Sequence, residues 1–242
     1  MATRDHASPV RLRGRPGALA GHLALPDSAP AMVTVNLALG DRTPTPVTAH
    51  VVRIGAKGLS GLRLDLPRWT PPGSYHGTVT VGDHERRVVV DVEPRPKVRM
   101  SPKRLLLRGR PKEAVTTEVV VSNVGNVACE VRGAYAFALF DPSSLERATQ
   151  RAFQSSARGD ESFIARVAAE LSDGYAGTVR LKVDHGTGSL EPGDSRELRA
   201  TLHLPDHLLS GRTYEGTWRI ANLGYNVEVE TADGNPSQEK VE

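Results

Sequence analysis

The sequence predicts an all-β protein made of two tandem β-sandwiches, the second of which carries a helical-hairpin insertion. Three observations support this fold class. Short segments alternate between apolar and polar residues, as strands with one buried face do. Two sequence landmarks recur in the same order, which indicates an internal repeat. In one segment of the second copy the apolar period changes from 2 to 3.6, the period of a helix.

The recurring landmarks define the two copies. Leu-Arg-Gly-Arg-Pro occurs at residues 12–16 and again at residues 107–111. Leu-x-Leu-Pro, followed by spaced Gly, Tyr, Gly and Thr, occurs at residues 64–78 and again at residues 202–217. The second copy is longer between its landmarks by about 43 residues. The predicted divisions are a first sandwich at 1–94, a proline-rich basic linker at 95–104, a second sandwich at 105–232 and a disordered polar tail at 233–242.

Period-two alternation predicts about seven short strands in each copy, which is typical of a sandwich of about 100 residues. Turn-forming Gly, Pro and Asp residues separate these segments, for example at residues 71–73 and 191–194. The clearest strands are at residues 33–39, 62–66, 79–81 and 88–92 in the first copy, and at 119–121, 127–131, 179–183, 198–204 and 225–229 in the second.

The segment Pro-Pro-Gly-Ser-Tyr-His-Gly at residues 71–77 predicts a turn followed by a strand. Gly73 suits the positive φ that a type II turn needs after proline. The ring of Tyr75 is expected to face the core while its hydroxyl bonds to backbone in the preceding loop, which resembles the tyrosine corner of immunoglobulin-like domains. Gly77 and Gly216 stand where antibody domains have a cysteine, so packing must replace the inter-sheet disulfide.

The segment Val-Val-Val-Ser-Asn-Val-Gly-Asn-Val at residues 119–127 resembles the strand–turn–strand start of bacterial immunoglobulin-like modules of the CARDB and NEW3 kind. It is also similar to the immunoglobulin-like domains of the ASPM, SPD-2 and Hydin group. The resemblance covers the second copy directly and the first copy through the repeat. It implies an immunoglobulin-like β-sandwich architecture, and it implies no activity.

The extra residues of the second copy, about 141–175, predict two short helices. We expect Asp141 to cap the first helix, with Pro142 at its first position, and Gly159 to end it. Asp160 is expected to cap the second helix, which Asp173 and Gly174 end. Such short helices need a partner surface. Two roles remain open, a lid over one end of the second core or a docking element. The candidate contact residues of this hairpin are Phe153, Phe163 and Ile164.

The net charge of +3 conceals a concentration of positive charge, because residues 97–112 hold seven basic and no acidic side chains. This basic run gives further candidate contacts with a partner. The run lacks the interleaved aromatic residues on which bases stack, which counts against nucleic-acid binding. Trp69, in a proline-rich loop, is another candidate contact. The candidate contacts of the basic run are Arg99, Lys103, Arg104, Arg108 and Arg110.

The sequence contains no recognised catalytic motif: no phosphate-binding loop, no dinucleotide glycine fingerprint and no zinc-protease or serine-hydrolase signature. We therefore expect no enzyme activity, no cofactor and no metal. Cys129, the only cysteine, alternates in register with Val127 and Val131 and is predicted to be a core thiol. One cysteine excludes an intrachain disulfide, and no apolar run follows the basic N-terminus, so the expected location is the cytoplasm without membrane insertion.

These observations predict a non-enzymatic structural or interaction protein, a scaffold or accessory subunit of a larger cytoplasmic assembly. Its partners would be other protein subunits. Two alternatives stay open. One is a nucleic-acid-associated factor that binds through residues 97–112. The other is a carbohydrate-binding accessory module, against which the aromatic content of 5% counts.

Overall fold

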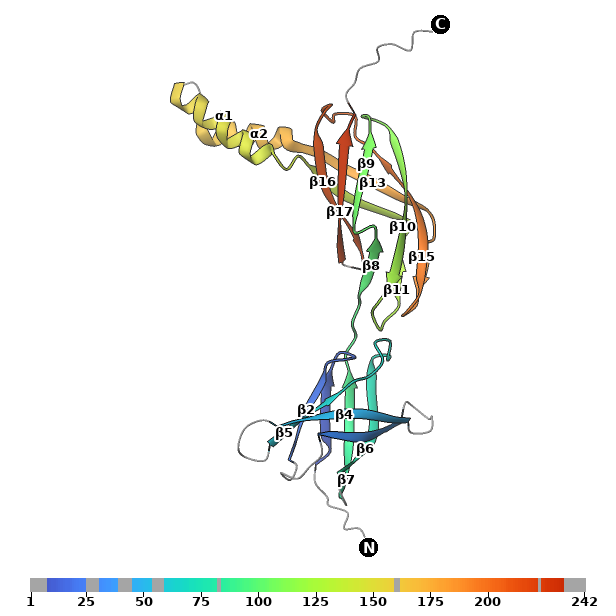
Figure 1. Cartoon of the computed structure of the whole chain (residues 1–242). Coiled ribbons are helices and arrows are strands. Elements are labelled where there is room, and N and C mark those ends of the chain that lie inside the picture. The colour runs from blue at the N-terminus through green and yellow to red at the C-terminus, as the bar shows by residue number, and fades with distance from the viewer. Residues whose placement is uncertain are drawn as a thin grey trace. The chain divides into compact units, whose positions relative to one another are not determined.

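The computed structural model describes residues 8–24, 31–38, 45–53, 59–81, 84–158, 162–221 and 223–232. Its contacts divide the chain into two compact units. The first domain comprises Met1–Lys97 with the loops Asn123–Ala128 and Glu191–Gly193, and the second domain comprises Val98–Ser122, Cys129–Leu190 and Asp194–Glu242. Figure 1 shows β1–β7 in one domain and β8–β17 with both helices in the other. The predicted tail at 233–242 lies outside the described residues.

The described residues of the first domain form seven strands: β1 (Val10–Gly14), β2 (Leu19–Ala24), β3 (Met32–Ala38), β4 (Thr45–Arg53), β5 (Leu59–Leu64), β6 (Gly73–Val81) and β7 (His84–Val92). They pair in the order β1-β2-β5-β4-β3-β6-β7, and β1 closes the ring by pairing in parallel with β7. Val33, Val35 and Leu37 of β3 are buried while the residues between them are exposed, as the alternation predicted.

In the second domain, the part of the chain that the structure describes has ten strands: β8 (Val98–Ser101), β9 (Arg104–Gly109), β10 (Ala114–Asn123), β11 (Cys129–Val131), β12 (Ala134–Phe140), β13 (Tyr175–His185), β14 (Gly188–Leu190), β15 (Ser195–His203), β16 (Thr213–Ile220) and β17 (Leu223–Thr231). The central order β10-β15-β13-β12-β16-β17-β9 repeats the first domain's order β2-β5-β4-β3-β6-β7-β1. The predicted fold class, two tandem immunoglobulin-like β-sandwiches with a helical hairpin in the second, is confirmed.

Part of the predicted linker at 95–104 belongs to the second domain instead. Residues 98–101 form β8, which lies beside β10 at one end of the eight-stranded sheet, and β9 begins at Arg104. Val98 and Met100 are buried while Arg99 between them is exposed. This is the same period-two pattern as in the other strands. The basic and proline residues around it concealed the strand.

Both domains contain the tyrosine contact that the sequence predicted for Tyr75. The Tyr75 hydroxyl donates a hydrogen bond of 2.6 Å to the carbonyl oxygen of Pro71. In the second domain the Leu209 amide donates to the hydroxyl oxygen of Tyr214 at 3.0 Å. Both rings are buried. Each tyrosine therefore ties the loop before its strand, β6 or β16, to the core. Two residues after each tyrosine, where antibody domains have a disulfide-bonded cysteine, this chain has a glycine.

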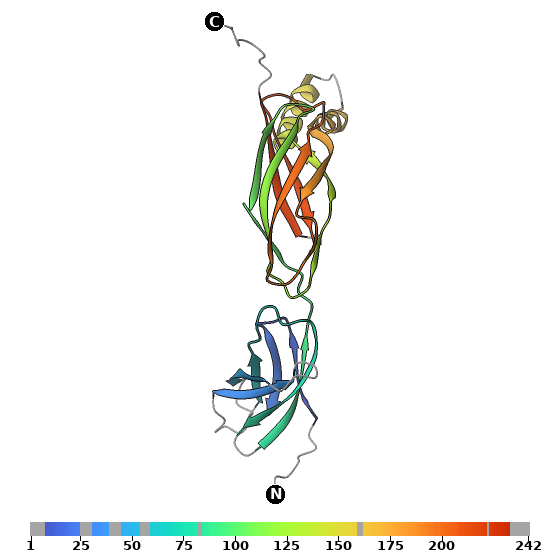
Figure 2. The same ribbon diagram turned by 90° about the vertical axis from the view of Figure 1, so that its right-hand side faces the viewer.

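The predicted helices lie between β12 and β13, at the position where the first domain connects β3 to β4. They are α1 (Ser144–Arg158) and α2 (Phe163–Gly174). Figures 1 and 2 place this hairpin at one end of the second domain. The predicted residues Gly159 and Asp160 lie outside the described residues. Ser162 is the N-cap of α2, without a side-chain hydrogen bond. No helix among the described residues combines the length and apolar content needed to cross a bilayer.

Candidate functional site

The basic run lies along the two ends of the second domain's sheet, and two of its arginines are paired. The Arg104 guanidinium contacts the carboxylates of Glu228 and Glu215, the latter at 3.7 Å. Arg108 Nε lies 2.5 Å from Glu230 Oε2. The acidic partners come from β17, which pairs with β9, and from β16, which pairs with β17. Part of the positive charge that the sequence concentrates at 97–112 is therefore neutralised in the fold.

Arg99, Lys103 and Arg110 are exposed and have no ion pair within the described ranges. Arg99 lies on β8, and Lys103 and Arg110 flank β9; these are the two terminal strands of the sheet. Charged side chains on terminal strands hinder pairing with another chain's strand. The basic run is thus explained as charged residues that keep the two terminal strands from pairing with another chain. That the basic run also contacts a partner stays a prediction.

Trp69 is 55% exposed in the first domain. Gly193, in a loop that clusters with this domain, lies against one face of the indole, since a Cβ there would be 3.4 Å from Trp69 Cε2. The amide and hydroxyl of Thr70 both donate to the Pro67 carbonyl and hold the loop. The tryptophan is thus partly exposed, as expected from its loop, and its contact role is untested.

The two helices of the hairpin pack closely on each other. Ala148 and Ala152 of α1 are fully buried, and such small side chains let the helices approach. Arg151 Nη1 of α1 lies 2.8 Å from the carboxylate of Glu170, a buried residue of α2. Arg166 also contacts this carboxylate, at 3.1 Å. The hairpin is therefore held by small residues and by a shared carboxylate within its own interface.

The hairpin carries several exposed apolar side chains. Phe153 is 64% exposed and Ile164 is 77% exposed, and Leu145 is also exposed. Phe163 is half-buried against Phe153, with ring centroids 5.0 Å apart. The buried core cluster of the second domain includes no residue of either helix. The arrangement favours a docking element over a lid, because a lid would bury these side chains against the core.

Asp141 holds the base of the hairpin. Its Oδ1 accepts hydrogen bonds from the amide and hydroxyl of Ser143. Its Oδ2 pairs with Arg147 of α1 and with Arg212, which precedes β16, at 3.2 Å. The helix begins at Ser144, three residues after this side chain, so Asp141 caps the turn before the helix and not the helix itself. Through Arg212, Asp141 joins the hairpin to the start of β16.

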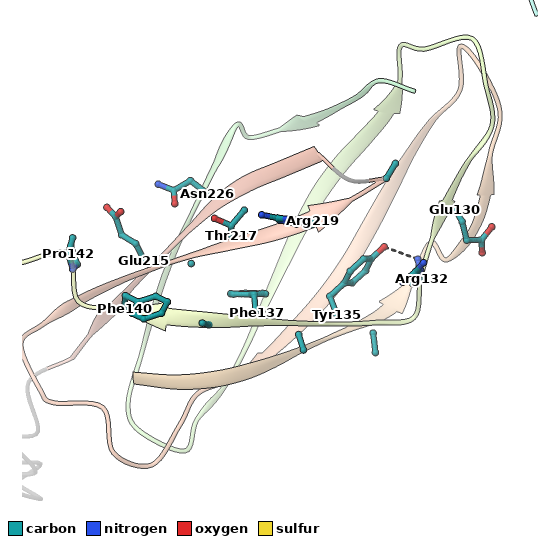
Figure 3. Close-up of a pocket in the computed structure, with 15 residues that line it drawn as sticks. Glu130, Arg132, Tyr135, Phe137, Phe140, Pro142, Glu215, Thr217, Arg219 and Asn226 are labelled. Atoms are coloured by element: carbon teal, nitrogen blue, oxygen red, sulfur yellow. Dashed lines mark hydrogen bonds between the residues drawn. The ribbon is translucent and has the colours of Figure 1, made fainter. Parts of the chain in front are cut away.

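The sheet between β12 and β16 is open along most of its length. The ladder between them has two residue pairs in the described chain, Leu139 with Gly216 and Phe140 with Glu215. Earlier residues of β12 continue beside β13, and later residues of β16 continue beside β17. The separating strands enclose a groove of about 860 Å³ (Figure 3). We call this groove the seam.

Backbone groups of both strands point into the seam. The Val183 amide donates to the Gly133 carbonyl at 2.9 Å, so Gly133 faces β13. Because the backbone alternates along a strand, Ala134, Ala136 and Ala138 face the opposite side. On β16, the Thr231 amide donates to Arg212 O, so alternation directs Thr217 and Arg219 into the seam. All five of these residues line the groove.

Gly216 sits where the ladder stops. A Cβ at this residue would lie 2.8 Å from the carbonyl oxygen of Ala138 and 2.7 Å from the Phe137 ring. Such contacts are shorter than a methyl group tolerates. The absence of a side chain thus lets β12 and β16 meet at the closed end of the seam.

The ends of the seam differ in chemistry. At the closed end, Phe140 and Tyr175 are both partly exposed, with ring centroids 5.2 Å apart. Arg219 lies along the seam, and Figure 3 shows Arg132 at the far end. Both arginines are exposed and have no ion pair within the described chain. Glu215, the acidic residue at the closed end, faces Arg104.

Sequence reasoning missed the seam. Residues 134–140, Ala-Tyr-Ala-Phe-Ala-Leu-Phe, alternate between alanine and a large apolar residue, and this strand was not among those expected. Because every residue is apolar, the polar face that marks a half-buried strand is missing. The alternation of residue size was the available signal.

The described residues offer little other chemistry. Within them, no group of three or more His, Cys, Asp or Glu side chains could hold a metal ion. Cys129 is buried in β11, with its Sγ 3.8 Å from the carbonyl oxygen of Leu190. The prediction of a core thiol is confirmed.

We expect Gly216→Ala to destabilise the second domain by about 1–3 kcal/mol, because the added methyl overlaps the backbone of β12. Gly133→Ala is the control, because its Cβ would have its nearest neighbour at 4.0 Å. Urea unfolding, followed by Trp218 fluorescence in a Trp69→Phe background, measures both variants. Equal stability of the two would contradict the close approach at Gly216.

Asp141 predicts a pH dependence. Burial raises the pKa of this carboxyl, but hydrogen bonds from Arg147 and Ser143 outweigh it and hold the pKa below its ordinary value of 3.8. The unfolded chain therefore binds the proton more readily, so this contribution is present well above pH 3.8 and is lost as the pH falls through the lowered folded-state pKa.

We expect Asp141→Asn to cost about 1–3 kcal/mol near neutral pH, since the arginines lose their charged partner. Between about pH 6 and about pH 3 the variant should lose less stability than the unsubstituted protein. Unfolding monitored by Trp218 at several pH values tests this. Parallel pH profiles for the two proteins would show that Asp141 is not the titrating group.

Comparison with known proteins identifies no family. No protein-family model matches the sequence, and no curated protein matches it. Similar solved structures include a protein of unknown function from Porphyromonas gingivalis W83 (12% identity, 93% of this chain and 96% of that chain, TM-score 0.30). Others are a titin segment (12%, 93% and 96%, 0.30) and the extracellular portion of mouse CD200RLa (9%, 93% and 100%, 0.33). With TM-scores of 0.33 or below, these likenesses carry no argument about fold or function.

Proposed function

We propose that this protein is a non-enzymatic interaction protein, a scaffold or accessory subunit that binds other protein subunits through its second domain. The observation that carries the proposal is the set of exposed apolar side chains on the hairpin, Leu145, Phe153 and Ile164. Large apolar side chains cost free energy when they contact water, and the core of the domain does not use them. The rings of Phe153 and Phe163 contact each other across the two helices, and exposed apolar patches are typical of protein interaction sites.

The position of the hairpin supports the same function. The first domain makes the equivalent connection, between β3 and β4, in the six residues 39–44. The fold therefore does not require the helices. An element that the scaffold does not need, and that is anchored by a charged residue such as Asp141, is suited to a specific contact.

The proposal also includes a cellular location and a likeness to known modules. We place it in the cytoplasm, because its single cysteine is a buried thiol and reducing compartments favour such composition. Fractionation of the native cells tests this, and recovery outside the cytoplasm would overturn it. We also keep the likeness to CARDB and NEW3 modules as a proposal, which the strand and turn at 119–127 support.

The test is the native size of the protein. Tagged protein from its own cells, analysed by size exclusion with light scattering, should elute as a complex larger than its own chain. The double variant Phe153→Ser, Ile164→Ser should elute as the single chain, because the apolar contact is lost. Gln154→Ser, on the same helix, is the control and should retain the complex. Elution of the unsubstituted protein as a lone chain, or an intact complex in the double variant, would refute the proposal.

A further inference from the structure

The seam has the properties of a binding site for an extended peptide. An open strand edge presents backbone N–H and C=O groups that pair readily with another strand. Here the edge of β12 lies inside a groove and not at the end of the sheet. The terminal strands β8 and β9 carry charged side chains, whereas the seam-facing residues of β12 are alanines. Strand pairing is therefore hindered at the sheet ends and unhindered at the seam.

The side chains around the seam define what would fit. Small side chains at Ala134, Ala136 and Ala138 leave the backbone of β12 accessible. Tyr135 and Phe137 also line the groove and give it an apolar floor. A strand bound here would direct alternate side chains toward this floor and the others toward solvent.

The charged residues beside the seam determine which outward-facing side chains a bound strand can carry. Arg219 and Arg132 are exposed beside the seam, and neither has an ion pair in the described chain. Of the two acidic residues that line the groove, Glu215 faces Arg104, and the side chain of Glu130 points away from the groove (Figure 3). Arginine binds carboxylates through paired hydrogen bonds. The rim of the seam is therefore suited to acidic side chains.

We propose that the seam binds an extended segment of a partner protein in which apolar and acidic residues alternate, and that the segment pairs with the open edge of β12. This inference rests on the proposed interaction function and names the chemistry of one partner. The open stretch, residues 134–138, sets the length of the paired region at about five residues. The partly exposed rings of Phe140 and Tyr175 bound the closed end.

The first test uses the purified full-length protein and a fluorescein-labelled probe, the seven-residue peptide Val-Glu-Val-Glu-Val-Glu-Val with blocked ends. Fluorescence anisotropy should detect saturable binding. The matching Val-Lys peptide should bind at least about tenfold more weakly, because the rim is basic. Equal binding of the two peptides, or no binding of either, would overturn the proposal.

The second test asks whether the backbone pairs. Two forms of the Val-Glu peptide carry N-methyl groups, one on its valines and one on its glutamates. Because alternate amides of a strand face the same neighbour, at least one form should lose about tenfold or more in affinity. Undiminished binding of both forms would show that only side chains are recognised, which contradicts strand pairing.

Variants of the protein locate the site. Arg219→Glu should weaken the Val-Glu peptide at least about tenfold, while Arg99→Glu, an exposed arginine on β8, should leave its affinity unchanged. Ala136→Pro should also abolish binding, because it removes a seam-facing N–H while the ladder to β13 remains. Circular dichroism checks that the Ala136→Pro variant is folded. If it is misfolded, the Arg219→Glu result alone decides whether the peptide binds at the seam. Weakening by Arg99→Glu and not by Arg219→Glu would move the site to the basic run.

These results are separable from the test of the proposed function. The peptide assay uses the isolated protein and the seam, whereas the native-size assay depends on the hairpin residues Phe153 and Ile164. Loss of peptide binding with an intact native complex would refute the seam alone. Peptide binding by a protein that elutes as a lone chain would refute the hairpin-dependent assembly alone.

Discussion

The interaction on which the second domain's surface depends is the short ladder between β12 and β16. Gly216 lets the two strands meet. The ladder ends after two residue pairs because the continuations of β12 and β16 follow different neighbours, β13 and β17. If this ladder continued, the groove would be an ordinary closed sheet, and the backbone of Ala136 would pair with β16. The open seam is therefore a consequence of where one ladder stops, within a strand order that the first domain shares.

The hairpin begins at the same place. Phe140 is the last residue of the ladder on β12, and Asp141 follows it. The carboxylate of Asp141 pairs with Arg212 at the start of β16, so the ion pair holds the two strands together beside their closed end. The insertion thus leaves the domain from the junction that also terminates the seam. One region of the fold accounts for both surfaces to which we assign partner binding.

Much of the fold was predictable because its signals are local. The period-two strands, the tyrosine contact of Tyr75 and the helical insertion at 141–175 follow from residues that are neighbours in sequence or nearly so. The strand β8 was hidden because basic and proline residues surround Val98 and Met100. The flanking basic and proline residues predict a linker at 95–104, whereas the short alternation at 98–101 predicts the strand that the structure contains.

The seam was not predictable in the same way. Its strands are about 80 residues apart, and whether they pair depends on the three-dimensional course of each strand beside β13 and β17. The sequence of β12 carries alternation of size and not of polarity, so even the strand escaped notice. Among the candidate contacts, Arg104 and Arg108 are paired with Glu228 and Glu230, partners more than 100 residues away that no local pattern reveals.

Amide hydrogen exchange in the free protein, resolved by residue, tests the open seam most directly. The amides of Ala136 and Ala138 face the groove and should exchange at least about tenfold faster than those of Tyr135 and Phe137, which face β13. This alternation within a single strand is what an unpaired edge predicts. Equal protection of all four amides would mean that β12 is paired on both sides, and the seam would not exist.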